Sequence, residues 1–371
     1  MRASPAQRVQ TPDGTPAWLL TRFCDVRAAL TDPRVSGSEV HSHGRDFTGY
    51  ALPRELRTNL INSESPAHGR LRQSIAPGLT SDRIAPLGPH LRDTATRLLA
   101  PYLRRREPFD LVTRYAGPLT VELTRTWLNL PTTIGEQFST WSAALIDPTP
   151  TTAPRARDSL ATMRRLTHAL IDAKRVDPAD DLVSTLVHAH DTTSTLSHDE
   201  LVSMVFYLLF VWHEASIDAI GNAVIALWHD PAGLAELRAS GDVARAAVDE
   251  LMRFDTAQPM AFRRFATTDL PIGDVTIPAG DTIVASLAAA NRDPEAFTDP
   301  ADLDLTRTPN PHLSFGHGIH GCPGATLARL HLQQAITAVV RTTAQLHPTG
   351  PSIRYRPGFR GRGPRELPMM P

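Results

Sequence analysis

Residues 315–329, FGHGIHGCPGATLAR, place a cysteine directly after a glycine-rich run and before an amphipathic segment. Four glycines surround Cys322, namely Gly316, Gly318, Gly321 and Gly324. Such a density of glycine suits a backbone that turns tightly and comes close to a flat ligand. Pro323 is expected to open a helix, because proline is favoured at the first helical position. Cys322 would then lie at a helix N-terminus, where the helix dipole lowers the pKa of a thiol and favours the thiolate.

Two kinds of metal centre fit a thiolate in this position. Zinc is usually bound by imidazole and thiolate groups, and three histidines could complete such a site with Cys322: His312, His317 and His320. Haem iron also accepts an axial thiolate, which pushes electron density toward cleavage of the O–O bond. The loop alone leaves both centres open, and motifs elsewhere in the chain decide between them.

The chain has 371 residues, and 38 lysine and arginine residues balance 39 aspartate and glutamate residues, for a formal net charge of −1. This balance gives no overall attraction to nucleic acid or to an anionic membrane, so neither partner is expected. Residues 1–371 are expected to form one large domain that is able to enclose a bulky cofactor. The two cysteines, Cys24 and Cys322, exclude a disulfide framework and fit a reducing cytoplasm.

The sequence predicts neither export nor a membrane span. Residues 1–20 lack the apolar core of a secretory signal. The most apolar run, residues 201–212, is shorter than the ~20 residues that cross a bilayer, so a buried core helix is expected there. The protein is therefore expected in the cytoplasm, away from the membrane.

Apolar residues recur three and four positions apart over most of the chain, including residues 25–30, 91–99 and 155–174, and this spacing predicts helices. Strand signals cluster late in the sequence. Residues 271–280 and 282–287 are expected to form paired strands with glycine-containing turns, and residues 352–357 another strand. The predicted fold class is mostly α with small β-sheets.

Residues 201–230 carry the longest helical pattern, without a proline, and are expected to form one uninterrupted helix. Its first half is apolar on all sides, so it should run through the core. Polar residues follow, and Glu214, Asp218 and Asn222 share one helix face at i, i+4 and i+8. Either the helix emerges into solvent there, or these groups have buried partners or a function.

The cysteine loop resembles the haem-binding signature of the cytochrome P-450 family: Phe, two variable residues, Gly, three variable residues, Cys, one variable residue, Gly. The matching positions here are Phe315, Gly318, Cys322 and Gly324. The resemblance implies a P-450 fold, haem b as the cofactor and Cys322 as the metal ligand. It also implies that Phe315, Gly316 and Gly324 contact the cofactor. His320 is similar to a histidine that binds a haem propionate in bacterial members.

Further motifs of the family occur in order along the chain. Three positions resemble its propionate-binding residues: His68, Arg72 and Arg264. Glu250 and Arg253 resemble its Glu-x-x-Arg pair, which shares a helix face, and together with Arg307 they resemble its structural triad. Arginine suits both tasks because its planar guanidinium binds a carboxylate through two hydrogen bonds. The resemblance spans nearly the whole chain and favours haem over zinc.

The resemblance also implies oxidation at iron with O2 and two electrons, acting on a small organic or peptidic natural product. The sequence shows no flavin or iron–sulfur segment, so a separate ferredoxin with its reductase is expected to supply the electrons. This ferredoxin is expected to dock over the cysteine loop, where Arg70 and Arg329 would be exposed.

The chain departs from the family where the long helix is implied to cross the haem. The usual motif ends in an acid and an oxygen-activating threonine, and the aligned residues here are Val211, Trp212, His213, Glu214, Ala215 and Ser216. Ala215 thus replaces the threonine, and Trp212 replaces a glycine. The expected pocket residues are Val211, Trp212 and Ala215, although Trp212 also fits a core aromatic. The candidates for proton delivery are Glu214, Ser216 and His213.

Three functions remain open. Hydroxylation of a natural product in secondary-metabolite biosynthesis is expected first. Oxidative coupling or cross-linking of aromatic groups, for example in a peptide, inserts no oxygen and is the alternative. The third function is a haem-binding protein with little turnover, because the oxygen-activating threonine is missing. Steady oxidation of a substrate with a ferredoxin separates an enzyme from such a binding protein.

Overall fold

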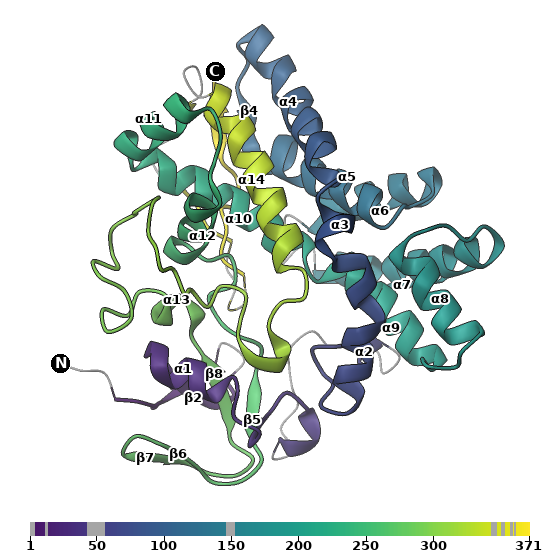
Figure 1. Ribbon diagram of the computed structural model, residues 1–371, viewed down its shortest axis with the longest axis vertical. Coiled ribbons are helices and arrows are strands. Elements are labelled where there is room, and N and C mark those ends of the chain that lie inside the picture. The colour runs from purple at the N-terminus through teal and green to yellow at the C-terminus, as the bar shows by residue number, and fades with distance from the viewer. Residues whose placement is uncertain are drawn as a thin grey trace.

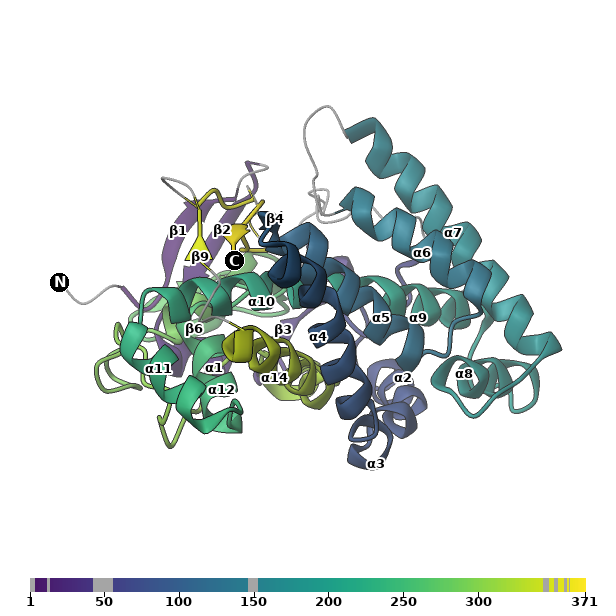
Figure 2. The ribbon, with the colours of Figure 1, turned by 90° about the horizontal axis from the view of Figure 1, so that it is seen from above.

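The computed structural model describes residues 4–11, 14–42, 56–145, 153–342, 347–349, 353–356, 359 and 361–371. Helices dominate this part of the chain, and the small sheets gather away from α6–α9 (Figures 1 and 2). The predicted fold class, mostly α with small β-sheets, is confirmed.

The described α-helices are α1 (Phe23–Ala29), α2 (Ala67–Ile75), α3 (Ser81–Ile84), α4 (Leu87–Arg105), α5 (Gly117–Trp127), α6 (Thr132–Leu145), α7 (Ala153–Val176), α8 (Leu182–Asp191), α9 (His198–Phe210), α10 (His213–Trp228), α11 (Pro231–Ser240), α12 (Arg245–Phe254), α13 (Leu287–Ala290) and α14 (Ala325–Thr342). The short turns are η1 (Glu39–His41), η3 (Ala76–Leu79), η6 (Gly318–His320) and the π-helical η4 (Val112–Ala116). The helices predicted at residues 25–30, 91–99 and 155–174 correspond to α1, α4 and α7.

The described strands form three small sheets. The first has the order β1 (Gln7–Gln10), β2 (Pro16–Leu20), β8 (Thr282–Ala285), β5 (Arg264–Ala266), β3 (Val35–Ser36). The second has the order β4 (Phe109–Asp110), β10 (Pro368–Met370), β9 (His347–Pro348), and the third pairs β6 (Leu270–Ile272) with β7 (Val275–Ile277). Strands β2 and β8 are parallel, and the other described pairs are antiparallel.

The late strands pair differently from the prediction. Strands β6 and β7 form a hairpin with each other around Gly273, whose φ of +60° glycine adopts without steric cost. Strand β8, predicted as their partner, lies between β2 and β5 instead. Within the predicted strand at residues 352–357, the described residues 353–356 contribute only an isolated bridge between Tyr355 and Pro364.

The long helix predicted at residues 201–230 is interrupted. Helix α9 ends at Phe210 and α10 begins at His213, with Val211 and Trp212 between them. Taken as one span, His198–Trp228 is long and apolar enough to cross a membrane by length and composition, yet 67% of its most apolar window is buried inside the protein. The prediction of a buried core segment is therefore confirmed, but the prediction of one continuous helix is wrong.

Three clusters of buried apolar side chains hold these elements together. The largest joins α4, α5, α10, α12 and α14. The second joins α2 with the helices from α5 through α9, and the third packs the five-stranded sheet against α1 and α13. Helices α10 and α14 pack against each other and lie near the centre of the fold (Figures 1 and 2). Because the cysteine loop leads directly into α14, this packing brings the loop close to the interrupted helix.

Candidate functional site

A cavity of about 290 Å³ lies between the α9–α10 segment, the cysteine loop and the residues that enter β5. Cys322 borders this cavity. From the α9–α10 segment, the bordering residues are Val211, Trp212, Glu214, Ala215 and Ser216. The structure thus brings the cysteine and most of the residues predicted for the distal side to one cavity.

The cysteine loop is held in a tight conformation. Cys322 lies deep in the molecule, and its side chain is exposed because it faces the cavity. Its backbone N–H donates to the carbonyl of Phe315 at 2.8 Å. Gly316 and Gly318 have φ angles of +68° and +73°, and a Cβ on Gly318 would lie 2.4 Å from the carbonyl oxygen of Leu30. Glycine is therefore required at Gly318 by both the backbone conformation and the packing.

Two expectations about the thiol are wrong. Helix α14 begins at Ala325, so Pro323 lies in the turn before the helix. Burial raises the pKa of the Cys322 thiol, and the hydrogen bond from the Gly324 N–H and two nearby arginines oppose this rise without offsetting it. Burial therefore favours the neutral thiol when no metal ion is bound. A bound metal ion would hold the sulfur deprotonated, because metal ligation and thiol deprotonation are linked.

The histidines around the cysteine do not form a zinc site with it. His312 Nε2 lies 3.3 Å from Asp249 Oδ1, and His317 Nε2 lies 3.3 Å from the Nε of Arg27. In the part of the chain that the structure describes, no group of three or more His, Cys, Asp or Glu side chains is arranged to hold a metal. Because protein zinc sites use at least three such ligands, the zinc alternative is wrong.

The residues predicted to bind propionates gather at one edge of the cavity. They are His68 and Arg72 on α2, Arg264 on β5 and His320 in the cysteine loop. The rings of His68 and His320 meet edge to face with their centroids 4.6 Å apart. Arg72 donates to the carbonyls of Ile319 and Gly321 at 3.1 and 2.7 Å, which ties α2 to the cysteine loop.

Positive charge is in excess at this edge. Burial lowers the pKa of Arg264 to about 10, with Glu64 opposing the shift. Burial, followed by the charges of His320 and Arg72, lowers the pKa of His68 to about 4. Burial alone would raise the pKa of Glu64, but His320, whose Nε2 lies 3.5 Å from Glu64 Oε1, and the hydrogen bond from the Gly37 N–H lower it to about 2. Since the guanidinium groups of Arg72 and Arg264 lie at this edge with the carboxylate of Glu64, the edge has the chemistry to accept further carboxylates, such as the two propionates of haem.

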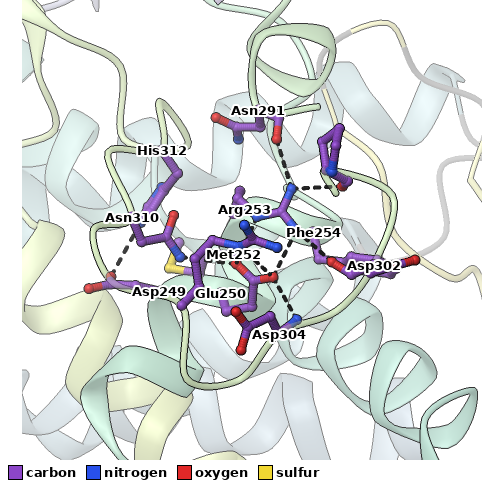
Figure 3. A network of polar contacts seen from close by, with 12 residues as sticks. Asp249, Glu250, Met252, Arg253, Phe254, Asn291, Asp302, Asp304, Asn310 and His312 are labelled. Atoms are coloured by element: carbon purple, nitrogen blue, oxygen red, sulfur yellow. Dashed lines mark hydrogen bonds and ion pairs between the residues drawn. The ribbon is translucent and has the colours of Figure 1, made fainter. Parts of the chain in front are cut away.

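Glu250 and Arg253 form a buried ion pair on α12 (Figure 3). Arg253 donates to both carboxylate oxygens of Glu250 at 2.7 and 2.8 Å, and the Nε of Arg307 lies 3.1 and 3.2 Å from the same oxygens. Glu250 also accepts from the Asp304 N–H at 2.9 Å and from the Asn310 amide at 3.1 Å. The three residues predicted as a triad are thus in contact, and they tie α12 to the segment that leads into the cysteine loop.

Asp249, which the sequence analysis did not identify, connects α12 directly to the cysteine loop. Its Oδ1 lies 2.5 Å from the Nε of Arg329 on α14 and 3.3 Å from His312. The Arg329 guanidinium lies 4.4 Å from the ring centroid of Phe315. Burial would raise the pKa of Asp249, but the bonds from His312 and Arg329 lower it to about 2. A carboxylate next to the Glu-x-x-Arg pair is the signal that could have revealed this contact.

Comparisons with known proteins agree with this arrangement. The family model for cytochrome P-450 matches residues 155–348. The chain is 34% identical to the mycinamicin IV hydroxylase/epoxidase of Micromonospora griseorubida, over 99% of this chain and 92% of that protein. The chain belongs to the cytochrome P-450 family. As a P-450 monooxygenase it uses haem b as its cofactor.

Two other relatives cover nearly the whole length of this P-450. The nocardicin C N-oxygenase of Nocardia uniformis subsp. tsuyamanensis is 36% identical over 98% of this chain and 92% of that protein. The tirandamycin C-bound P-450 monooxygenase TamI has a solved structure that superposes with a TM-score of 0.86, at 34% identity over 99% of this chain and 94% of that one. The expected P-450 fold is therefore confirmed.

The interrupted helix of this P-450 points its residues in two directions. Trp212 faces the cavity and also packs edge to face against Trp127 and His331, with ring centroids 6.2 and 5.8 Å apart. Both interpretations of Trp212, as pocket residue and as core aromatic, therefore hold. His213 is 1% exposed, packs against Phe138 with ring centroids 5.5 Å apart, and is not among the described residues that line the cavity. Its position does not match the expectation of direct proton delivery.

The polar face that follows does not emerge into solvent. Asp218 and Asn222 are each 1% exposed. Asp218 forms an ion pair with the buried Arg356, and the amide of Asn222 donates to the carbonyl of Arg362 at 2.7 Å. A Cβ on Gly363 would overlap the Asp218 carboxylate, so glycine is required there. These contacts fix the C-terminal segment against α10, next to the cavity.

Tyr207 is a cavity residue that the sequence analysis missed. It lies on α9 one turn before Val211, so both side chains reach the same wall. Burial raises the pKa of its phenol, and Cys322 is near enough to raise it further. The hydroxyl is therefore a neutral hydrogen-bond donor that faces the space between α9 and the cysteine. The spacing of Tyr207, Val211 and Ala215 at i, i+4 and i+8 is the signal that could have identified it.

Proposed function

We propose that this P-450 hydroxylates a small organic or peptidic natural product in secondary-metabolite biosynthesis. The observation that carries the proposal is one cavity bordered by Cys322 on one side and by Glu214, Ala215 and Ser216 on another. Relatives support the biosynthetic role. One is named a polyketide biosynthesis cytochrome P-450 of Bacillus subtilis, 30% identical over 95% of this chain. Another solved structure is a P-450 hydroxylase from the leinamycin biosynthetic pathway of Streptomyces atroolivaceus, 34% identical.

Haem b bound in this cavity supplies an iron centre at which O2 is activated with two electrons. Cys322 would ligate the iron through its sulfur, and His68, Arg72, Arg264 and His320 would bind the propionates. The guanidinium groups of Arg72 and Arg264 at that edge support the second assignment, because buried cations are stabilised by paired carboxylates. Phe315 and Gly316 border the cavity and would contact the macrocycle, whereas Gly324 would act through its N–H on the sulfur.

Proton delivery in this proposal does not use a threonine, because Ala215 occupies that position. Glu214 and Ser216 line the cavity within one helical turn of each other, and Ser216 is 8% exposed. A carboxyl group and a hydroxyl at this spacing are able to pass a proton to a group in the cavity. The hydroxyl of Tyr207 is a third donor on the same wall. His213 is not retained as a direct donor because its ring packs against α6.

The chemistry of the cavity wall supports an organic substrate of moderate size. Aromatic side chains contribute to it, namely Phe206 and Phe210 from α9 and Phe262 from the segment before β5. Three amide side chains lie among them, namely Asn59, Asn62 and Gln258. Apolar surface with a few placed hydrogen-bonding groups is the usual composition of a site for small organic ligands. Trp212 would narrow this space and restrict the pose of the substrate.

The electron donor is proposed to be a ferredoxin that docks over the cysteine loop. Arg70 and Arg329 are less suited to this than expected, because each is paired. Arg70 donates to both oxygens of Glu200 at 2.6 and 3.0 Å, and Arg329 is held by Asp249. Ile319, which is 49% exposed, keeps an apolar contact available on the loop itself. We further propose that residues 1–371 act as one domain in the cytoplasm.

The test uses the haem-loaded protein with a ferredoxin, its reductase and a panel of natural products. A spectral shift of the haem on addition first identifies compounds that bind in the cavity, and turnover is then followed by mass spectrometry. A product that gains one oxygen atom supports the proposal. A product that loses two hydrogen atoms and joins two aromatic groups would instead establish oxidative coupling. Tight binding without any oxidised product would leave a haem-binding protein with little turnover and would overturn the proposal.

A further inference from the structure

A pair of tryptophans leads from the cavity toward the surface of the protein. Trp212 lines the cavity, and its ring meets the ring of Trp127 edge to face, with centroids 6.2 Å apart and planes at 84°. Both values are those of a close aromatic contact. Trp127 ends α5, is half-buried and is not among the described residues that line the cavity, so its exposed part faces outward. Trp141, which packs behind the helix break against His213, is only 4% exposed.

The indole of Trp212 is suited to giving up single electrons. It loses an electron more readily than a neutral imidazole, so the neighbouring His331 does not compete with it. A phenol is oxidised readily only when its proton leaves at the same time. Tyr207 also lines the cavity, but burial raises the pKa of its phenol and no described residue accepts a hydrogen bond from it. Trp212 is therefore the aromatic side chain of the cavity best placed to donate an electron.

The surroundings of the two indoles favour electron transfer from Trp127 to Trp212. Nε1 of Trp212 is buried and has no hydrogen-bond partner among the described residues. Nε1 of Trp127 donates to the carbonyl of Gly78 at 3.1 Å. A charged donor binds an acceptor more strongly than a neutral one, so this bond stabilises the cation that remains when Trp127 loses an electron. Contact with solvent stabilises it further, because a positive charge is costly in the interior.

The cavity also carries side chains that a strong oxidant damages. Cys322, Met252 and Met260 border it. A thiolate is oxidised stepwise to acids that are not reduced again, and a thioether is oxidised to a sulfoxide. A P-450 monooxygenase forms an oxidant in its cavity, and that oxidant reaches these side chains when no substrate consumes it. An electron donor at the cavity wall would remove the oxidant first.

We propose that Trp212 and Trp127 form an electron relay that protects the cavity when an oxidant forms there without a substrate. Trp212 reduces the oxidant, Trp127 reduces Trp212, and a one-electron reductant in solution, such as ascorbate, reduces Trp127. Each passage moves one electron inward and oxidises one molecule of reductant. Two passages, with two protons from solvent, reduce the oxygen atom left by a peroxide to water. The relay goes beyond the proposed hydroxylation, since it acts when no substrate is bound.

The first experiment mixes the haem-loaded wild type with hydrogen peroxide, without substrate, and records electron paramagnetic resonance spectra of rapidly frozen samples. We expect a tryptophan radical that ascorbate removes within the mixing time. In Trp127→Phe the radical should be confined to Trp212 and should outlast the addition of ascorbate several-fold longer. A wild type that forms no radical, or a tyrosine radical alone, would overturn the proposal. Equal removal by ascorbate in the two proteins would also overturn it.

The matched control is Trp228→Phe. Trp228 is likewise half-buried and packs edge to face, against His347 with ring centroids 5.7 Å apart. It is not among the described residues that line the cavity. The control should therefore behave like the wild type, and a control that behaves like Trp127→Phe would contradict the assigned route.

Damage to the cavity provides a second readout that needs no product. Peptide mass spectrometry after repeated additions of peroxide measures the sulfoxides of Met252 and Met260. Ascorbate should lower both several-fold in the wild type and in the control, and much less in Trp127→Phe. This difference separates the relay from direct removal of peroxide by ascorbate, which all the proteins share.

Trp212→Phe interrupts the relay at its inner end and should abolish the protection by ascorbate in the same way. It keeps the test decisive if Trp127→Phe does not fold, which circular dichroism reports. Equal sulfoxide in the wild type with and without ascorbate would overturn the proposal without any variant. Full protection by ascorbate in folded Trp212→Phe would overturn it as well.

Discussion

Replacing Glu250 by Gln tests how strongly the buried cluster of α12 stabilises the fold. The Glu250 and Arg253 side chains are both 0% exposed, and their two hydrogen bonds are 2.7 and 2.8 Å long. Glutamine removes the charge and leaves the Arg253 guanidinium buried beside an amide. Breaking a buried ion pair by changing one partner costs about 3–5 kcal/mol. Glu250 also accepts from Arg307 and from the Asp304 N–H, so we expect the upper part of this range.

The assay is urea unfolding of the haem-loaded protein, followed by circular dichroism. The matched control is Glu107→Gln, because Glu107 pairs with Arg105 at 3.8 Å while their side chains are 56% and 69% exposed. Such exposed pairs contribute about 0–1 kcal/mol. Since native proteins are stable by only about 5–15 kcal/mol, Glu250→Gln should lower the unfolding midpoint far more than the control. Equal midpoints for the two variants would refute the argument from burial.

Three further predictions concern the site and its surroundings. Pro323→Leu should raise the reduction potential of the haem in a redox titration, because a new N–H beside Cys322 weakens its electron donation; an unchanged or lower potential would contradict this. Ala215→Thr should leave product formation nearly unchanged or impair it. Trp212→Gly should loosen substrate specificity. A many-fold gain in coupled turnover in Ala215→Thr would instead mean that the native site is a degraded form of the threonine proton relay. The pKa of the buried His213 imidazole is lowered to about 3, so the stability it contributes is complete above about pH 6.5 and is lost as the pH falls toward 3. His213→Phe should therefore lose less stability on acidification than the wild type, and parallel unfolding curves would argue against a neutral buried imidazole.

The sequence predicted the parts of this protein in which local pattern and packing agree. Helices with apolar residues three and four positions apart formed where they were expected, as in α4 and α7. The glycines of the cysteine loop predicted a close approach, and Gly318 indeed leaves no room for a Cβ. These features are local, so a single sequence is enough to specify them.

Contacts between distant segments were not predictable in the same way. The helix break at Val211–Trp212 contains neither proline nor glycine, and the packing of Trp212 against α5 and α14 accompanies it. Strand β8 pairs with β2, which lies more than two hundred residues earlier in the chain. Glu64 meets His320 across a similar separation. The pKa of Cys322 rises because burial, which the sequence does not display, outweighs the local hydrogen bond.

We propose above all that Cys322 ligates the iron of haem b through its sulfur. The most direct measurement is the absorption spectrum of the reduced carbon monoxide complex, recorded for the purified wild type and for Cys322→Ala. We expect the red-shifted Soret band of a thiolate ligand in the wild type and its loss in the variant, even if the variant retains some haem. A wild-type protein that carries no haem, or a variant that keeps the red-shifted band, would contradict the claim.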